Sequence, residues 1–251
     1  MPRIGLSALF YSLIVSSSCF AQERSQVTNE SGNRYSQAQE VFYVLKSDPA
    51  IKDGPYQFLR NNKLRVSGFY RNNQKDSVWE IYAYNSLLSC RKWFHQGVRT
   101  GKWEFFTYKG EPDWTYDFNT RTVSYLKNPS EDTLTSYYQT EAGAWIRGHL
   151  DNLPLPLNST EEWLTYLNQN FRYPSDAVDQ NKQGRVVIDV TVDENGNALD
   201  YTVSQSVWPT MDAEALRVVK GYPYEFVPAE KNGKKVKAIF QSPVIFKLVQ
   251  H

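Results

Sequence analysis

Residues 184–196 read GRVVIDVTVDENG, and this stretch decides the fold of the C-terminal part of the 251-residue chain. Val186, Ile188, Val190 and Val192 alternate with Val187, Asp189 and Thr191, which is typical of a half-buried strand. Asn195-Gly196 favours a tight turn because its residues tolerate positive φ. Leu199, Tyr201 and Val203 then return as a second strand. The stretch therefore predicts an antiparallel hairpin.

Two helices and a final strand are predicted around this hairpin. Upstream, Ser159 and Glu162 form a capping-box pattern, and Pro174 ends the helix that it begins; a second short helix could occupy 174–180. Downstream, a helix is expected over 211–220, and a long strand over 236–249. The order helix, strand, strand, helix, strand over residues 158–251 predicts an α+β module, whose small antiparallel sheet is covered on one face.

Seven segments of this module resemble the TonB C-terminal domain family in order and spacing, over about Leu164 to Gln250. They are Tyr173-Pro174, Gly184-Arg185-Val186, Asp193-Glu194-Asn195-Gly196, Ser206, Met211-Asp212-Ala213-Glu214-Ala215-Leu216, Phe226-Val227-Pro228-Ala229 and Pro243-Val244-Ile245-Phe246-Lys247-Leu248. The resemblance implies capture of a short periplasmic peptide, the TonB box of an outer-membrane transporter, which adds a strand to an open sheet edge. The candidate contact residues carried over are Asn170, Phe171, Arg172, Tyr173, Pro174, Phe240, Ser242, Val244, Ile245, Phe246 and Leu248.

Two of the residues in this region have a second interpretation. Tyr173 could equally pack in the core. Pro243 lacks a backbone N–H, which suits an edge strand but leaves a gap in any strand that pairs with it.

An earlier region, residues 40–126, contains a period of 23 and 24 residues. Tyr56, Trp79 and Trp103 form one aromatic row, and a second row with the same spacing consists of Tyr70, Phe94 and Phe118. Each unit is expected to be a hairpin, and the hairpins must stack to bury these rings. From about Asp53 to Phe118 the pattern resembles MORN-type repeats, which implies a binding platform; the alternative is that the rings only join the strands. The fold class is thus an all-β repeat domain followed by the α+β module.

The segments outside these two domains have weaker signals. Residues 22–39 are polar and are expected to be a flexible lead-in. Residues 119–157 lack a clean period, and short strands are considered at 120–126 and 144–146. Residues 127–157 are interpreted as a linker, with a domain boundary close to Asp151. The prolines in Leu153-Pro154-Leu155-Pro156-Leu157 hold the end of this linker extended.

Residues 1–21 have a basic start, an apolar centre and small residues at the exit, which predicts a signal peptide cleaved after Ala21 and a periplasmic protein. The alternatives are lipid attachment at Cys19 and an uncleaved membrane anchor. After cleavage, Cys90 would be the only cysteine, and we expect it to behave as a small hydrophobe.

The charge balance and the motif content give no signal of nucleic-acid binding or of catalysis. Lys plus Arg number 28 against 27 acidic residues, so no strong field attracts nucleic acid. The three histidines have no ligand spacing, and neither a phosphate-binding glycine loop nor a Gly-x-Ser-x-Gly motif is present, so no enzyme and no cofactor are predicted. The expected partner is an outer-membrane TonB-dependent transporter or another periplasmic peptide segment. A soluble periplasmic adaptor not coupled to membrane energy is the alternative; an inner-membrane complex and a homodimer through edge strands stay open.

Overall fold

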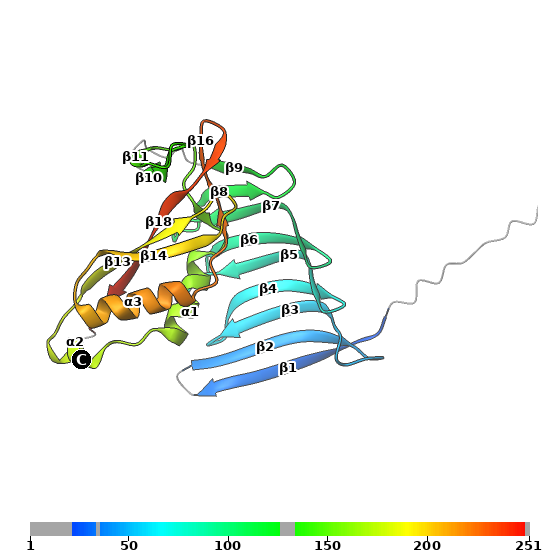
Figure 1. Ribbon diagram of the computed structural model, residues 1–251. Coiled ribbons are helices and arrows are strands. Elements are labelled where there is room, and N and C mark those ends of the chain that lie inside the picture. The colour runs from blue at the N-terminus through cyan, green and yellow to red at the C-terminus, as the bar shows by residue number, and fades with distance from the viewer. Residues whose placement is uncertain (1–21, 34–35, 126–133, 249–251) are drawn as a thin grey trace, which may run out of the picture.

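The computed structural model describes residues 22–33, 36–125 and 134–248, and these form two modules that lie side by side (Figure 1). An N-terminal all-β module of stacked antiparallel hairpins is followed by an α+β module, as the sequence predicts. The predicted signal peptide at residues 1–21, the start of the predicted linker up to residue 133 and the last three residues lie outside the described residues.

The N-terminal module is a nine-stranded antiparallel sheet in which each strand pairs with the next along the chain. Its strands are β1 (Arg24–Asn33), β2 (Ser36–Leu45), β3 (Lys52–Arg60), β4 (Lys63–Arg71), β5 (Gln74–Tyr82), β6 (Leu88–His95), β7 (Val98–Phe106), β8 (Pro112–Asp117) and β9 (Thr122–Tyr125).

The two aromatic rows pack against each other on one face of this sheet. The Trp79 ring lies 5.2 Å from that of Tyr56 and 5.0 Å from that of Tyr70, and one repeat later Trp103 packs on Phe94 and Phe118. The indole N–H of Trp79 donates to the Phe69 carbonyl at 3.2 Å, and that of Trp103 donates to the Trp93 carbonyl at 3.0 Å. The repeat thus recurs in its hydrogen bonds as well as in its rings, and the rings join neighbouring hairpins.

The expectation of a flexible lead-in at 22–39 is wrong. The described residues of this segment form β1 and the start of β2, and β1 pairs with β2 along its whole length, from Arg24↔Leu45 to Asn33↔Ser36. The Arg24 guanidinium also donates to the buried carboxylate of Asp53 at 2.7 Å. Polar composition did not prevent a strand here, because an edge strand takes its ladder from its neighbour and leaves its side chains in water.

The C-terminal module is built on a five-stranded antiparallel sheet with the order β11-β10-β18-β13-β14. Its strands are β10 (Thr135–Gln139), β11 (Trp145–His149), β13 (Gly184–Val192), β14 (Ala198–Gln205) and β18 (Ala238–Phe246). Two small ribbons accompany it, β12 (Leu155–Pro156) with β15 (Phe226–Val227) and β16 (Ala229–Lys231) with β17 (Lys234–Val236). The last strand of the sheet, β18, is shorter than the strand predicted at 236–249.

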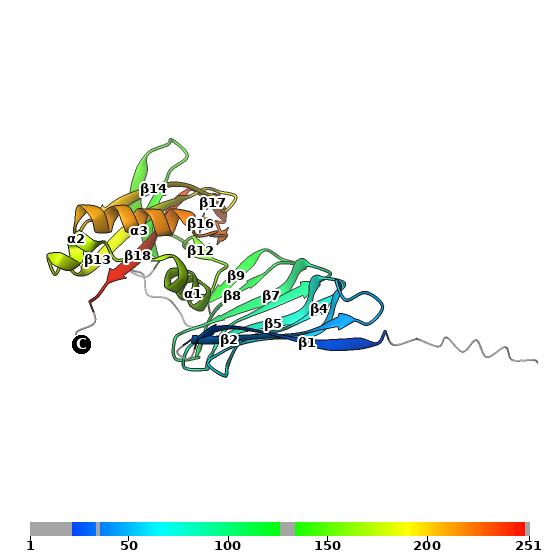
Figure 2. The same cartoon turned by 90° about the horizontal axis from the view of Figure 1, so that it is seen from below.

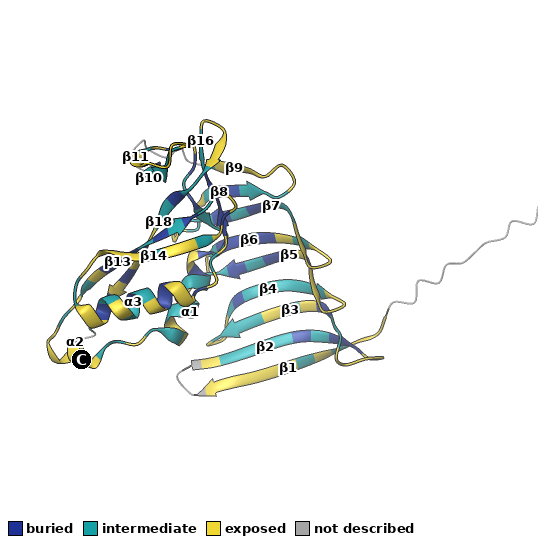
Figure 3. Ribbon diagram, in the orientation of Figure 1, coloured by how far each residue is buried: buried dark blue, intermediate teal, exposed yellow. Residues whose placement is uncertain are grey.

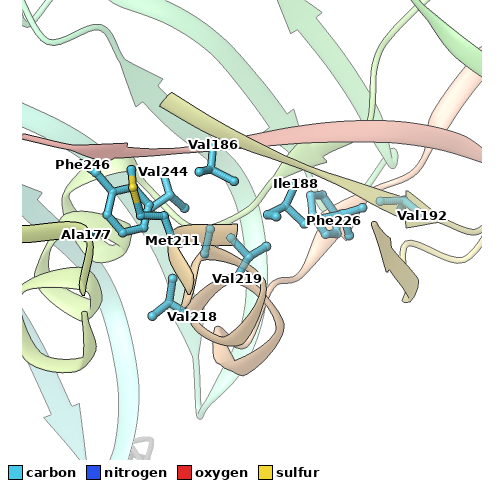
Figure 4. Packing of buried hydrophobic residues seen from close by; sticks show 12 residues of the cluster. Ala177, Val186, Ile188, Val192, Met211, Val218, Val219, Phe226, Val244 and Phe246 are labelled. Atoms are coloured by element: carbon cyan, nitrogen blue, oxygen red, sulfur yellow. The ribbon is translucent and has the colours of Figure 1, made fainter. Parts of the chain in front are cut away.

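Three helices cover one face of this sheet: α1 (Thr160–Asn170), α2 (Ser175–Asp179) and α3 (Pro209–Gly221). The predicted capping box is confirmed, because the Glu162 N–H donates to Ser159 Oγ and the Ser159 N–H to the Glu162 carboxylate. The core lies between α3 and the sheet, as Figure 4 shows. Its fully buried side chains include Ile188 and Val190 of β13 and Met211 and Val219 of α3.

The linker predicted at 127–157 is largely part of the second module. β10 and β11 extend the sheet beyond β18, because Leu150 is buried with Ala229 and Ala238 and holds the hairpin there. The segment around Leu155 is extended, as its prolines predict, but it pairs with β15.

The two modules share a hydrophobic core. Leu157 and Val227 of the second module pack with a buried set from the repeat sheet: Ile81, Cys90, Trp103, Phe105 and Trp114. In Figure 2, α1 lies between the two sheets, and Figure 3 shows buried stretches on β5 to β8, near α1. At this junction the buried Lys92 ammonium donates to the Glu162 carboxylate at 2.8 and 2.9 Å, and Arg99 pairs with Glu225.

Candidate functional site

Strand β18 has one fully paired side and one largely open side. On one side it pairs with β13 over nine residues, from Gly184↔Phe246 to Val192↔Ala238. On the other side its ladder with β10 consists of one pair, Tyr138↔Ala238. The predicted edge strand is therefore covered at its start and open from Phe240 onward among the described residues.

The hydrogen bonds to β10 show which backbone groups face this open side. The Gln139 N–H donates to the Lys237 carbonyl at 2.8 Å, and Ser136 Oγ donates to the Ile239 carbonyl at 3.0 Å. Successive residues of a strand point their backbone groups to opposite sides. The backbone groups of Gln241, Pro243 and Ile245 therefore also point away from β13, into the open side.

The open edge consequently offers three carbonyl oxygens and two N–H groups. Pro243 contributes a carbonyl only, because its nitrogen carries no hydrogen. Its place in the register, opposite Val187, leaves the β13 ladder complete. The side chains of Gln241, Pro243 and Ile245 are exposed, Ile245 by 68%.

The side chains of the alternate residues point into the module. Val244 and Phe246 are 1% exposed and belong to the core beside α3. The Ser242 hydroxyl is buried 2.9 Å from that of Tyr224, and Phe240 packs on Tyr224 and Phe226. Of the candidates carried over on this strand, Ile245 alone is exposed and has its backbone on the open edge.

The candidate stretch at 170–174 lies beside the end of β18. Phe171 and Tyr173 both pack on the Phe246 ring, at 5.0 and 5.5 Å between ring centres. The Tyr173 hydroxyl donates to the Lys182 carbonyl at 2.5 Å, and burial raises the pKa of this phenol. These contacts favour the second interpretation of Tyr173, in which its side chain packs in the core.

The other candidates surround this aromatic cluster. The Asn170 side chain donates to the Tyr166 carbonyl of its own helix at 2.9 Å, and the Arg172 N–H donates to the Glu214 carboxylate at 2.6 Å. Pro174 is the N-cap residue of α2, and the Leu248 N–H donates to the Gln183 side chain at 2.9 Å. The stretch therefore supports the end of β18 rather than extending its open edge.

Two residues of the edge were absent from the sequence-derived set, Gln241 and Pro243. The period of two could have found them: the buried positions 242, 244 and 246 leave 241, 243 and 245 to face outward. The missing N–H of Pro243 indicates an edge strand, but it does not by itself show which residues face a partner.

The module is thus an α+β domain with an open strand edge. Residues 169–248 match the family described as Gram-negative bacterial TonB protein C-terminal, and they carry a TonB C-terminal domain. The match spans fewer than half of the 251 residues and begins at the end of α1, so the repeat sheet and the β10–β11 hairpin lie outside it. The comparisons with curated proteins and with solved structures found no match.

The match links the chain to TonB-dependent transport in the periplasm of Gram-negative bacteria, and domains of this family interact with outer-membrane transporters without being enzymes. Within residues 22–33, 36–125 and 134–248, no helix is long and apolar enough to cross a membrane. The same residues contain no group of three or more His, Cys, Asp or Glu that could hold a metal ion.

Proposed function

We propose that the open edge of β18 captures an extended peptide segment of an outer-membrane TonB-dependent transporter by strand addition. The observation that carries this proposal is the outward direction of the Gln241, Pro243 and Ile245 backbone groups on a strand whose other side is fully paired. Backbone groups along such an edge supply affinity, and neighbouring side chains supply selectivity.

The matched pair Ile245→Pro and Ile245→Ala tests this proposal. Proline removes the outward N–H and places its ring where the captured strand would lie, whereas alanine keeps the N–H. Neither change touches the β13 ladder, because the Ile245 backbone points away from it. We expect the proline variant to bind the peptide at least about tenfold more weakly, because it loses one hydrogen bond and sterically excludes the captured strand. The alanine variant should lose less affinity.

The measurement is calorimetric titration of the full chain with synthetic peptides taken from the periplasmic ends of outer-membrane transporters. Thermal unfolding of each variant serves as the control for folding. Equal affinity of the wild-type chain and the folded Ile245→Pro variant would show that β18 is not the docking edge.

Pro243→Val provides the opposite change. Valine adds the missing N–H at an exposed position, and it is favourable in strands. One additional hydrogen bond is worth about 1 kcal/mol, so we expect roughly fivefold tighter peptide binding. The same variant should self-associate more, because proline on an open edge hinders pairing between copies. Unchanged affinity would contradict the assigned direction of the edge.

We further propose a periplasmic location after cleavage at Ala21; attachment through lipid or through an uncleaved N-terminal segment is the alternative. The mature N-terminus, determined by mass spectrometry of cell fractions, tests this. A soluble chain that begins at Gln22 favours the adaptor function, and a membrane-bound chain that retains Met1 or Pro2 favours direct energy transduction.

A further inference from the structure

The β10–β11 hairpin occupies part of the edge at which the proposed capture takes place. It lies on the same side of β18 as the outward groups of Gln241, Pro243 and Ile245. Its residues precede the matched family segment, 169–248, so the hairpin is a feature of this chain outside that segment. A captured strand would lie end to end with β10 along β18.

Several contacts fix the hairpin in this position. β10 and β11 are paired over five residues, from Thr135↔His149 to Gln139↔Trp145. Leu134 and Leu150 are buried beneath them, and the Leu150 N–H donates to the Leu134 carbonyl at 2.9 Å.

At the turn of the hairpin, the Glu141 carboxylate accepts from Lys234 of β17 at 2.7 Å. This exposed pair adds little stability. The buried leucines and the ladder resist displacement of the hairpin by an incoming strand.

We propose that this hairpin limits the docking edge at one end and that the end of β18 at Phe246 limits it at the other, so that a captured segment pairs with β18 over five residues, opposite Gln241 to Ile245. This inference rests on the proposed function. A segment of five residues is about 17 Å long. Its residues at positions one, three and five would bond to the edge, and the central one would only donate, to the Pro243 carbonyl.

The residues beside the edge give the captured segment a preferred charge distribution. At one end of the edge, Ile245 is paired with Arg185 of β13, and both side chains are exposed on the same face of the sheet. Arg185 makes no ion pair with a described residue. At the other end, Gln241 donates through its side chain to the Asp189 carboxylate at 3.0 Å. A segment with an acidic or apolar residue beside Ile245, and without an acidic residue beside Gln241, therefore fits best.

Peptides of five, seven and nine residues with a shared core sequence test the length limit on the full chain. We expect less than about a twofold gain in affinity from five to nine residues, since the additional residues find no free edge. Hydrogen exchange on the same samples should show that the Gln241 and Ile245 amides become protected. The Gln139 amide, bonded to the Lys237 carbonyl, should keep its protection.

A steady rise in affinity with length, with loss of Gln139 protection, would show that the hairpin is displaced and would overturn the inference while leaving capture intact. No binding at any length would refute the proposed function and this inference together.

Two five-residue peptides, with Asp at the first or at the last position, test the charge preference. The two peptides should bind the wild-type chain with different affinities. The Arg185→Glu substitution should reverse which of the two binds more tightly. An order that Arg185→Glu leaves unchanged would overturn this part of the inference.

Discussion

Substitution of Leu157 by alanine tests whether the two modules form one cooperative unit. The Leu157 side chain is 6% exposed and packs in the core shared with the repeat sheet, next to residues such as Trp103 and Trp114. Alanine removes the equivalent of three buried carbons, worth about 2.4 kcal/mol in transfer free energy, and a residual cavity brings the expected loss to about 3 kcal/mol. The backbone bond from the Leu157 N–H to the Glu225 carbonyl, 2.7 Å, is retained.

Scanning calorimetry and urea unfolding measure this effect. For a chain of about 250 residues, 3 kcal/mol corresponds to a decrease in Tm of about 6 °C. We expect one transition in the wild-type chain and either a shifted or a divided transition in the variant. Leu199→Ala, at a position that is 55% exposed, is the matched control and should change the stability by less than about 0.5 kcal/mol. Two separate transitions in the wild-type chain, or a loss below about 1 kcal/mol in Leu157→Ala, would refute a shared core.

Three further predictions concern the repeat sheet. A Cβ at Gly68 would lie 2.3 Å from the Trp79 ring, so Gly68→Ala should cost about 1–3 kcal/mol in urea unfolding, and an unchanged midpoint would contradict this packing. The Gln96 N–H, 3.0 Å from the Asp76 carboxylate, holds the pKa of Asp76 below its ordinary value. The stability that the Asp76 carboxylate contributes is complete above the unfolded-state pKa of about 3.9 and is lost as the pH falls through the folded-state pKa. When the unfolding midpoint is plotted against pH, Asp76→Asn should therefore make its decrease at acidic pH less steep. Burial raises the pKa of the Cys90 thiol to about 12, so peptide mapping after iodoacetamide treatment at neutral pH should find Cys90 modified only in urea; modification in the folded chain would contradict its burial.

The periodic parts of the fold were predictable from the sequence, and the non-local pairings were not. The alternation of Val186, Ile188 and Val190 predicts β13 because one face of that strand is buried. The capping box at Ser159 predicts the start of α1 because both of its hydrogen bonds are local. The polar sequence of β1 does not predict a strand, because the hydrogen bonds of β1 come from its pairing with β2. The position of β10 in the sheet is not predictable from local sequence either, because its partner, β18, lies about a hundred residues further along the chain. Pairings of this kind depend on tertiary contacts that a local pattern does not encode.

The open strand edge was predictable from the sequence, but the residues that face it were not. The sequence placed it on the last strand, and Pro243 indicated an edge before any pairing was known. The candidates Ser242, Val244 and Phe246 were carried over with the strand as a whole, and they turn out to support it from the buried face. Which residues of a strand face a partner depends on its register with its neighbour, here Val187↔Pro243, and that is a property of the folded sheet.

The shared core also bears on the two functions considered for the whole chain. A strand held on β18 would transmit load through the β13 ladder into the core beneath α3, and then through Leu157 and Val227 into the repeat sheet. Nine strands at a spacing of about 4.8 Å make that sheet about 38 Å wide, and it packs on the second module through a buried core. An attachment of this kind fixes the position of the captured segment relative to the whole repeat surface. The proposed adaptor function needs no more than this fixed geometry, whereas energy transduction would also require a force applied through the sheet.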